Sequence, residues 1–266
     1  MMLNMLERDC GEVLWNGMPL SVANCNVGYL AEERGLYPKY TLMDQLMYFA
    51  ELRGVKKDEA RRRIAAYARR LSVEEYLYPP KTGRGTPKSL KADQLSKGNQ
   101  QKIQLMAALI SDPELIILDE PLSGLDPVNA DIFKALIREQ IAAGKYIIMS
   151  SHQMATVEEF CTDITILDRS HTVLQGNLND IKRSYGRVNL RLKVERDVSG
   201  IIAASGARII TEKEFEYMVK VSGEAHANQI LRNLIDNGVT VIAFDLSEPS
   251  LHEIFVEKVE KADAQK

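Results

Sequence analysis

Apolar residues in the middle of the chain come in short unbroken runs separated by amphipathic stretches. Leu115–Leu118 and Tyr146–Met149 are two such runs, and they predict parallel strands buried on both faces. The helical pattern between them, near 128–143, fits the right-handed crossover that joins neighbouring parallel strands. Residues 26–30 predict a further apolar strand. These segments together predict an α/β fold with a mostly parallel sheet.

Helical spacing dominates between residues 41 and 110. Two amphipathic helices are predicted near 41–53 and 57–71, and another from 95 to 110. The first of them places four apolar side chains on one face: Leu42, Leu46, Phe49 and Ala50. We therefore expect a helical subdomain over about 41–110.

The last third of the chain predicts a separate small domain. After a hairpin at 164–174 and a short helix, the pattern is strand, helix, strand, strand, helix, strand, with the middle strands joined by the polar segment 211–214. This order is typical of a split βαβ sandwich, an α+β fold. A final helix is expected from Ser250 to Lys261. The predicted domains are 1–186 and 187–266.

Composition narrows the class of protein. Of the 266 residues 45% are hydrophobic, enough for a packed core, and the formal net charge is −3 with a pI of about 5.9. An acidic chain lacks the basic footprint of nucleic-acid-binding proteins, so we expect no nucleic-acid partner. The chain contains no apolar run of about 18 residues, so no membrane span is predicted. Three cysteines without metal-ligand spacing fit a reducing compartment: Cys10, Cys25 and Cys161.

Acidic side chains follow one of the predicted buried strands. Asp119 and Glu120 stand at its carboxyl end, where α/β sheets bind ligands. One carboxylate there can hold a hydrated Mg²⁺ while the other orients a water molecule. The next strand delivers His152 to the same edge, where an imidazole can donate a hydrogen bond to a phosphate oxygen. Taken alone, that histidine would be read as an ordinary surface or capping residue.

The segment LSKGNQ (95–100) opens a helix with features of an anion site. Ser96 suits the N-cap position, and Gly98 lets a phosphate approach the backbone. The free amides of a helix N-terminus favour an anion. The plainer alternative is a capped helix without a ligand, so this segment alone is weak support for a site.

The order of these segments resembles the ATP-binding subunits of ABC transporters, over essentially the whole chain. Leu95–Asn99 is similar to the signature motif and Ile116–Glu120 to the Walker B strand. Ser123–Asp126 is similar to the D-loop, and His152 to the switch histidine. Gly28–Tyr37 resembles the Q-loop region, with a Glu where the family usually has Gln. Four ordered motifs are far more specific than any one of them.

This resemblance implies ATP and Mg²⁺ as cofactors and roles for the residues that match. Asp119 would bind Mg²⁺ through water, Glu120 would polarise the attacking water, and His152 would contact the γ-phosphate. Ser96 and Gly98, with Asn99 in the same motif, would reach across a head-to-tail dimer to the nucleotide of the partner. Two further residues would serve the assembly, one linking the two sites and one lying between nucleotide and permease: Asp126 and Glu32.

The resemblance also implies a fold and an assembly. The fold would be an ABC ATPase of the P-loop NTPase class, with a parallel sheet, a helical subdomain and a small C-terminal domain like those of bacterial sodium-efflux or multidrug exporters. The partners would be a separate transmembrane permease and a second ATP-binding subunit, identical or not. The chain would lie in the cytoplasm at the inner face of the membrane.

The family's phosphate-binding loop has no counterpart in these residues. The pattern G-x-x-x-x-G-K-[ST] does not occur; its faint likeness at 83–89 is rejected because Pro87 replaces the required glycine and removes a backbone donor. The first residues, before a turn at Asn16-Gly17, read as the end of the helix that would follow the loop. Since the loop supplies most β- and γ-phosphate binding, we expect weak ATP binding or none.

Three explanations for the missing loop stay open. The chain is a fragment of a longer protein, or a degenerate subunit that contributes only its signature face to an intact partner, or a non-transport ABC ATPase that works on nucleic acid or ribosomes. The acidic pI, the absence of coiled-coil heptads and the C-terminal module argue against the last of these.

Overall fold

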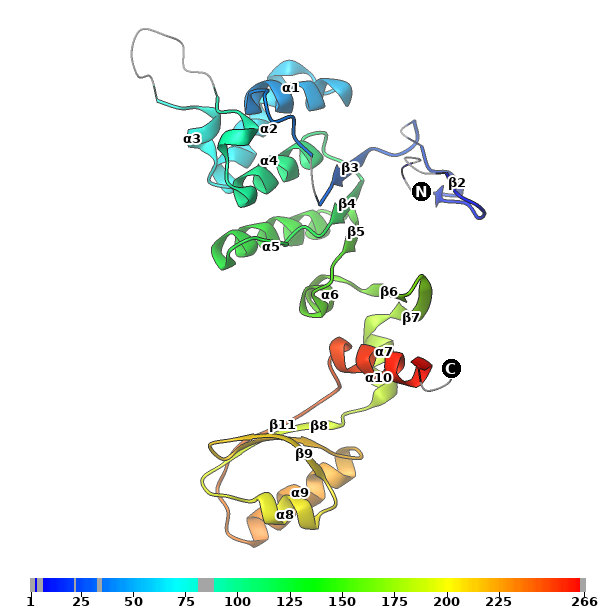
Figure 1. Ribbon diagram of the computed structural model, residues 1–266, viewed down its shortest axis with the longest axis vertical. Helices are drawn as coiled ribbons and strands as arrows, with labels where there is room; N and C mark the ends of the chain where they lie inside the picture. The colour runs from blue at the N-terminus through cyan, green and yellow to red at the C-terminus, as the bar shows by residue number, and fades with distance from the viewer. Residues whose placement is uncertain (1–2, 4–6, 22, 33–34, 81–88, 264–266) are drawn as a thin grey trace. The chain divides into compact units, whose positions relative to one another are not determined.

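The computed structural model describes residue 3 and residues 7–21, 23–32, 35–80 and 89–263 (Figure 1). It forms two compact units, Met1–His152 and Gln153–Lys266, which are described separately. Residues 1–2 and 4–6 of the segment predicted to end a helix at the start of the chain lie outside the described residues, whereas residues 7–13 are described and form no helix. Most of the phosphate-loop look-alike at 83–89 also lies outside the described residues.

The sheet of the first unit has three parallel strands in the order β3 (Val27–Leu30), β4 (Leu115–Asp119) and β5 (Tyr146–Ser150). The predicted parallel sheet is thus confirmed. Helix α4 (Lys97–Leu109) packs closely on β3. A Cβ atom at Gly28 would lie 2.3 Å from the carbonyl oxygen of Ala108, so this approach requires glycine.

The predicted helices of the first unit begin and end within two residues of their expected bounds. The described helices are α1 (Leu42–Leu52), α2 (Lys57–Arg70), α3 (Glu74–Leu77), α4 and α5 (Pro127–Ala142), with a short 3₁₀ helix η1 at Ala92–Gln94; α3 and η1 were not predicted. The Thr41 hydroxyl accepts a hydrogen bond from the Asp44 amide and caps α1. The apolar face of α1 is fully buried at Leu42, Leu46 and Ala50, as its helical spacing predicts.

Strand β5 departs from the prediction that it is buried on both faces. Tyr146 and Ile148 are 65% and 40% exposed, because β5 is the edge of the described sheet and one of its faces is only partly covered. The Trp15 ring meets Tyr146 edge-on, with centroids 5.2 Å apart. Trp15 belongs to the small hairpin of β1 (Leu14–Trp15) and β2 (Met18–Pro19), which turns at Asn16-Gly17 as predicted.

The second unit begins with α6 (Met154–Phe160) and the antiparallel hairpin β6 (Asp163–Asp168) and β7 (His171–Asn177). Helix α7 (Leu178–Tyr185) follows, and the last helix, α10 (Leu251–Asp263), packs against α6 and β7. One apolar cluster unites these elements around four buried side chains: Ile164, Ile166, Leu178 and Leu251. The chain therefore returns at its end to the elements that precede residue 186.

Residues 189–247, here called the C-terminal module, form the predicted split βαβ sandwich. Its elements are β8 (Asn189–Val194), α8 (Ser199–Ala204), β9 (Arg208–Lys213), β10 (Glu216–Lys220), α9 (Glu224–Asp236) and β11 (Val241–Ser247). The sheet is antiparallel in the order β11-β8-β10-β9. The domain boundary after residue 186 stays a prediction.

One detail of the module was predicted wrongly. The polar segment 211–214 was expected to join two strands, yet β9 continues to Lys213. The turn itself is only Glu214-Phe215, and both residues have a left-handed backbone, with φ of 48° and 63°. The cross-strand hydrogen bonds to β10 outweigh the polar character of these side chains.

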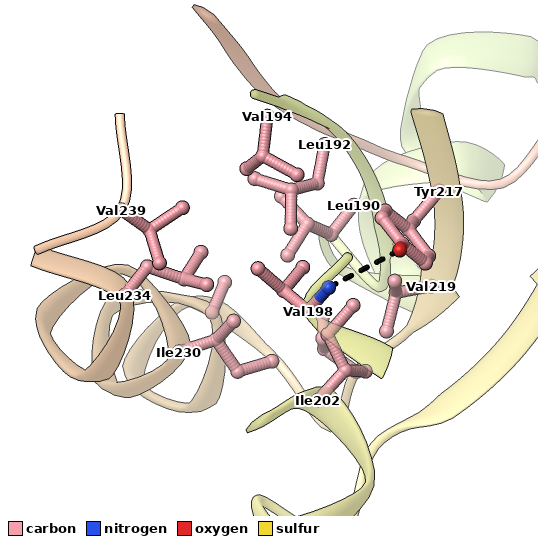
Figure 2. Packing of buried hydrophobic residues seen from close by; sticks show 12 residues of the cluster. Leu190, Leu192, Val194, Val198, Ile202, Tyr217, Val219, Ile230, Leu234 and Val239 are labelled. Atoms are coloured by element: carbon pink, nitrogen blue, oxygen red, sulfur yellow. Dashed lines mark hydrogen bonds between the residues drawn. The ribbon is translucent and has the colours of Figure 1, made fainter. Parts of the chain in front are cut away.

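Tyr217 is the largest fully buried side chain of the module's core (Figure 2). Its hydroxyl accepts a hydrogen bond from the Val198 amide at 3.2 Å and donates one to the Asp197 carboxylate at 2.9 Å. Burial, with the hydrogen bond to Asp197, raises the pKa of Tyr217 to about 12. The hydroxyl thus joins the start of α8 to the sheet.

We expect Tyr217→Phe to destabilise the module by about 1–2 kcal/mol, because the Val198 amide then loses a buried acceptor. Urea unfolding followed by circular dichroism measures this, with the exposed Tyr48→Phe as control. Since the folded-state pKa is raised, the wild-type stabilisation is complete below about pH 10, the value for unfolded tyrosine, and is lost as pH rises towards 12. Equal stability of wild type and Tyr217→Phe at neutral pH would contradict this role.

Candidate nucleotide phosphate site

The register of the parallel sheet brings three chain segments to one edge. Leu118 lies opposite Leu30 on one side and Met149 on the other, so the residues that follow these positions leave the sheet together. Asp119 lies directly opposite Ser150. The carboxyl edge of a parallel sheet is where α/β proteins bind ligands.

The Ser150 hydroxyl organises this edge. It donates a short hydrogen bond to Oδ1 of Asp119 and accepts one from the Glu120 amide at 3.1 Å. Glu120 has a left-handed backbone, with φ of 46°, which costs a non-glycine residue about 1–2 kcal/mol. The hydrogen bond that the Glu120 amide donates to Ser150 helps to hold Glu120 in this conformation.

Glu120 and His152 form a close pair. Oε1 of Glu120 accepts a hydrogen bond from the His152 amide at 2.8 Å and lies 2.9 Å from its Nδ1. Nδ1 therefore faces the Glu120 carboxylate, and Nε2 is the ring nitrogen that does not face it. The His152 side chain is 67% exposed and that of Glu120 is 16% exposed, so the imidazole is the more accessible group.

The start of α4 is built as the sequence predicts, with one addition. The Ser96 hydroxyl accepts from the Asn99 amide at 3.4 Å and caps the helix. Gly98 packs against the side chain of Leu125, where an added Cβ would lie 3.4 Å from Cδ2. The side-chain amide of Asn99 donates to the Tyr76 hydroxyl at 3.0 Å, an interaction that the sequence did not predict.

Asp126 and Glu32 occupy different settings. Asp126 caps α5, and the hydrogen bond from the Asn129 amide, at 3.1 Å, is the main cause of its lowered pKa. Glu32 is exposed and lies two residues beyond Leu30, as Glu120 lies two beyond Leu118. Glu32 and Glu120 therefore follow neighbouring parallel strands at the same edge of the sheet.

Two residues of this site were missed as individual contributors. Ser150 was part of a recognised segment, but its bridging role needed the strand register. Gln101 is 5% exposed, and its Nε2 donates to the backbone oxygens of Glu120 at 3.3 Å and Pro121 at 2.9 Å. Its Oε1 has no partner among the described residues. Gln101 therefore ties α4 to the segment that follows β4.

Comparison with known proteins decides the family. The family model described as "ABC transporter" matches residues 1–123, and the model "ATP-binding protein DrrA1-3-like, C-terminal domain" matches residues 176–259. The uncharacterized ABC transporter ATP-binding protein YhaQ of Bacillus subtilis (strain 168) is 38% identical over 97% of this chain and 83% of its own. The chain belongs to the ABC transporter ATP-binding proteins.

Two further comparisons agree. An uncharacterized ABC transporter ATP-binding protein of Alkalihalophilus pseudofirmus is 38% identical over 99% of this chain and 95% of its own. A solved structure described as "Structure of ATP binding subunit of ABC transporter" is 28% identical, with a TM-score of 0.59, over 69% of this chain and 74% of that chain. The family and the ABC ATPase fold that the motifs predicted are thus confirmed.

The side chains at the sheet edge of this ABC ATP-binding protein fit a Mg²⁺ ion that takes most of its ligands from water and substrate phosphates. Within the described ranges, no three His, Cys, Asp or Glu side chains gather as a metal site. Asp119 offers one carboxylate, beside the Ser150 hydroxyl. That set fits Mg²⁺, which keeps several waters and binds through one or two carboxylates plus substrate phosphates.

Among the described helices, none combines the length and the hydropathy of a membrane span.

We expect Ser150→Ala to loosen the site, because Glu120 loses the acceptor that holds its strained amide. Stability should fall by about 1 kcal/mol, and the Glu120 amide should exchange its hydrogen faster by about fivefold to tenfold. Hydrogen exchange followed by NMR measures both, with Ser123→Ala, in the next turn, as control. Unchanged exchange at Glu120 would show that Ser150 does not hold this backbone.

Proposed function

We propose that this chain is the ATP-dependent subunit of an ABC exporter and acts on a separate membrane permease. The observation that carries the proposal is the grouping of Asp119, Glu120 and His152 at one edge of a parallel sheet. The helix α4 start, with its capping Ser96, supplies a second anion-binding element. The subunit acts at the cytoplasmic face of the membrane, and it has no nucleic-acid partner.

Each residue of the sheet edge has a role suited to its chemistry. Asp119 would hold Mg²⁺ through water, and the ion would neutralise charge on the ATP phosphates. Glu120 orients the attacking water; its side chain is 16% exposed and lies beside the imidazole of His152. His152 contacts the γ-phosphate through Nε2, the ring nitrogen that does not face Glu120.

The start of α4 serves a second ATP-binding subunit, identical or not. Ser96 and Gly98 present the free amides of the helix to the nucleotide of that partner, with Asn99 supporting the turn through Tyr76. Asp126 links the two sites from the start of α5. Glu32, exposed at the edge of the sheet, lies between nucleotide and permease.

A second candidate is a non-catalytic subunit that lends only its signature face. It is favoured by one sequence fact, that G-x-x-x-x-G-K-[ST] does not occur in these 266 residues. Without that cradle of amides and its lysine, the carboxylates lack the groups that bind β- and γ-phosphates most strongly. The two candidates differ only in whether Glu120 contributes to hydrolysis.

We expect the chain on its own to bind MgATP with a Kd weaker than about 1 mM. Isothermal titration calorimetry measures the affinity. Phosphate release should equal that of the matched control Glu120→Gln, because hydrolysis needs a firmly held γ-phosphate. A micromolar or tighter Kd that is lost in Asp119→Asn would contradict this expectation and show that the chain binds ATP without the loop.

Adding the ATP-binding chain with which it assembles in its own cells separates the two candidates. MgATP-dependent association, lost in Ser96→Trp, supports the proposed subunit role. Hydrolysis by the mixture that Glu120→Gln abolishes indicates a catalytic subunit, and hydrolysis that survives this change indicates a non-catalytic one. The absence of MgATP-dependent association would contradict both.

A further inference from the structure

One carboxylate of α6 joins three helices of the second unit. Oε1 of Glu158 accepts a hydrogen bond from the Leu251 amide, at the start of α10, at 2.6 Å. The same oxygen lies 3.0 Å from Nζ of Lys182, on α7. Both charged side chains are only about a quarter exposed, 25% for Glu158 and 24% for Lys182. A partly buried carboxylate facing a helix N-terminus and a cation is well placed to hold both.

The first turn of α10 also contacts the C-terminal module. The Glu253 amide donates to the Ser250 hydroxyl at 3.2 Å, and the Ser250 amide donates back to Oε2 of Glu253 at 2.8 Å, which forms a capping box. The Glu253 carboxylate accepts two further hydrogen bonds from the Asn189 side chain, at 2.9 and 3.0 Å. Nζ of Lys220 lies 3.8 Å from it. Strands β8 and β10 are thereby linked to α10.

The apolar side of α10 completes this arrangement. Leu251 and Ile254 are fully buried, and Leu251 joins the cluster formed by the β6–β7 hairpin and α7. Helix α10 thus contacts α6 through the Glu158 carboxylate, the module through Glu253, and the apolar cluster through Leu251. The module is attached at both ends, since it follows α7 and precedes α10.

Helix α6 is joined directly to the chain segment that carries His152. Helix α6 begins at Met154, two residues after His152. We propose that Glu158 is a positioning residue that couples the C-terminal module, through α10 and α6, to the chain segment carrying His152. The functional meaning of this coupling rests on the proposed role of His152 as a phosphate contact. A protein or ligand that binds the module would then change the order of the 151–160 segment.

A purely structural role for Glu158 makes a different prediction. A residue that only stabilises the fold alters global unfolding, and a change on the module side of α10 leaves α6 untouched. A positioning residue transmits a change made at Glu253 to residues 151–160, although Glu253 contacts β8 and β10 rather than α6.

Hydrogen exchange of the full chain without nucleotide, followed by mass spectrometry, tests the coupling. Glu158→Ala and Glu253→Ala should each speed exchange in peptides covering 151–160 by about tenfold, the effect of losing one hydrogen bond to a charged group. Glu158→Gln should restore part of the protection, because its amide oxygen still accepts from Leu251. The matched control is Glu216→Ala, which removes an ion pair with Arg191 on the same module sheet but not on α10.

Each outcome has one meaning. Faster exchange at 151–160 in Glu253→Ala but not in Glu216→Ala supports the proposal. Exchange changes confined to α10 and β8, or equal changes in both variants, overturn it. If Glu158→Ala does not fold, Asn189→Ala weakens the same link from the exposed module side and is read in the same way. The experiment needs no ATP, so a failure of the proposed function leaves its result valid, and the reverse also holds.

Discussion

The site of this protein depends on the parallel register of β3, β4 and β5. Pairing of Leu118 with Leu30 and Met149 sets where each strand ends, and so which side chains meet at the edge. A slip of one residue would turn the alternate side chains to the opposite face of the sheet. Asp119 would then no longer lie opposite Ser150, and Glu120 would lose the hydroxyl that holds its strained backbone.

Because of this register, the first unit presents different groups at two places. The sheet edge carries the acidic pair and the imidazole, whereas the start of α4 carries free amides. Gln101 connects the two, because its side chain lies on α4 and its amide holds the backbone beyond β4. These hydrogen bonds therefore link the position of α4 to the backbone of Glu120. The described residues group an acidic pair and an imidazole at one edge of the sheet, which we propose receives a metal-bound phosphate, and the pattern G-x-x-x-x-G-K-[ST] does not occur in the 266 residues.

Much of the fold could be predicted because local patterns agree with the tertiary structure. Leu115, Ile116 and Leu118 of the unbroken run at 115–118 are buried as expected, and Ser96 caps its helix. Predictions failed where the outcome depends on neighbours that a local pattern does not reveal. The run at 146–149 looks like a central strand, yet β5 lies at the edge of the described sheet.

The contacts of the site were harder to predict than its residues. Asp119, Glu120 and His152 were found from their places after apolar strands, but the bridging hydroxyl of Ser150 needed the register. Glu158 accepts from a backbone amide 93 residues away, and no spacing rule links such positions. The return of α10 to the elements before residue 186 has the same cause, since its apolar face fits any core of suitable shape.

The location of the proposed phosphate site can be measured directly with MnATP, whose paramagnetic ion broadens NMR signals near it even when binding is weak. Amide spectra of the full chain would be recorded at millimolar MnATP. The account predicts selective broadening at residues 119–120 and 150–152, reduced in Asp119→Asn. Broadening elsewhere with these amides unaffected would contradict the claim that this sheet edge is built to receive a metal-bound phosphate.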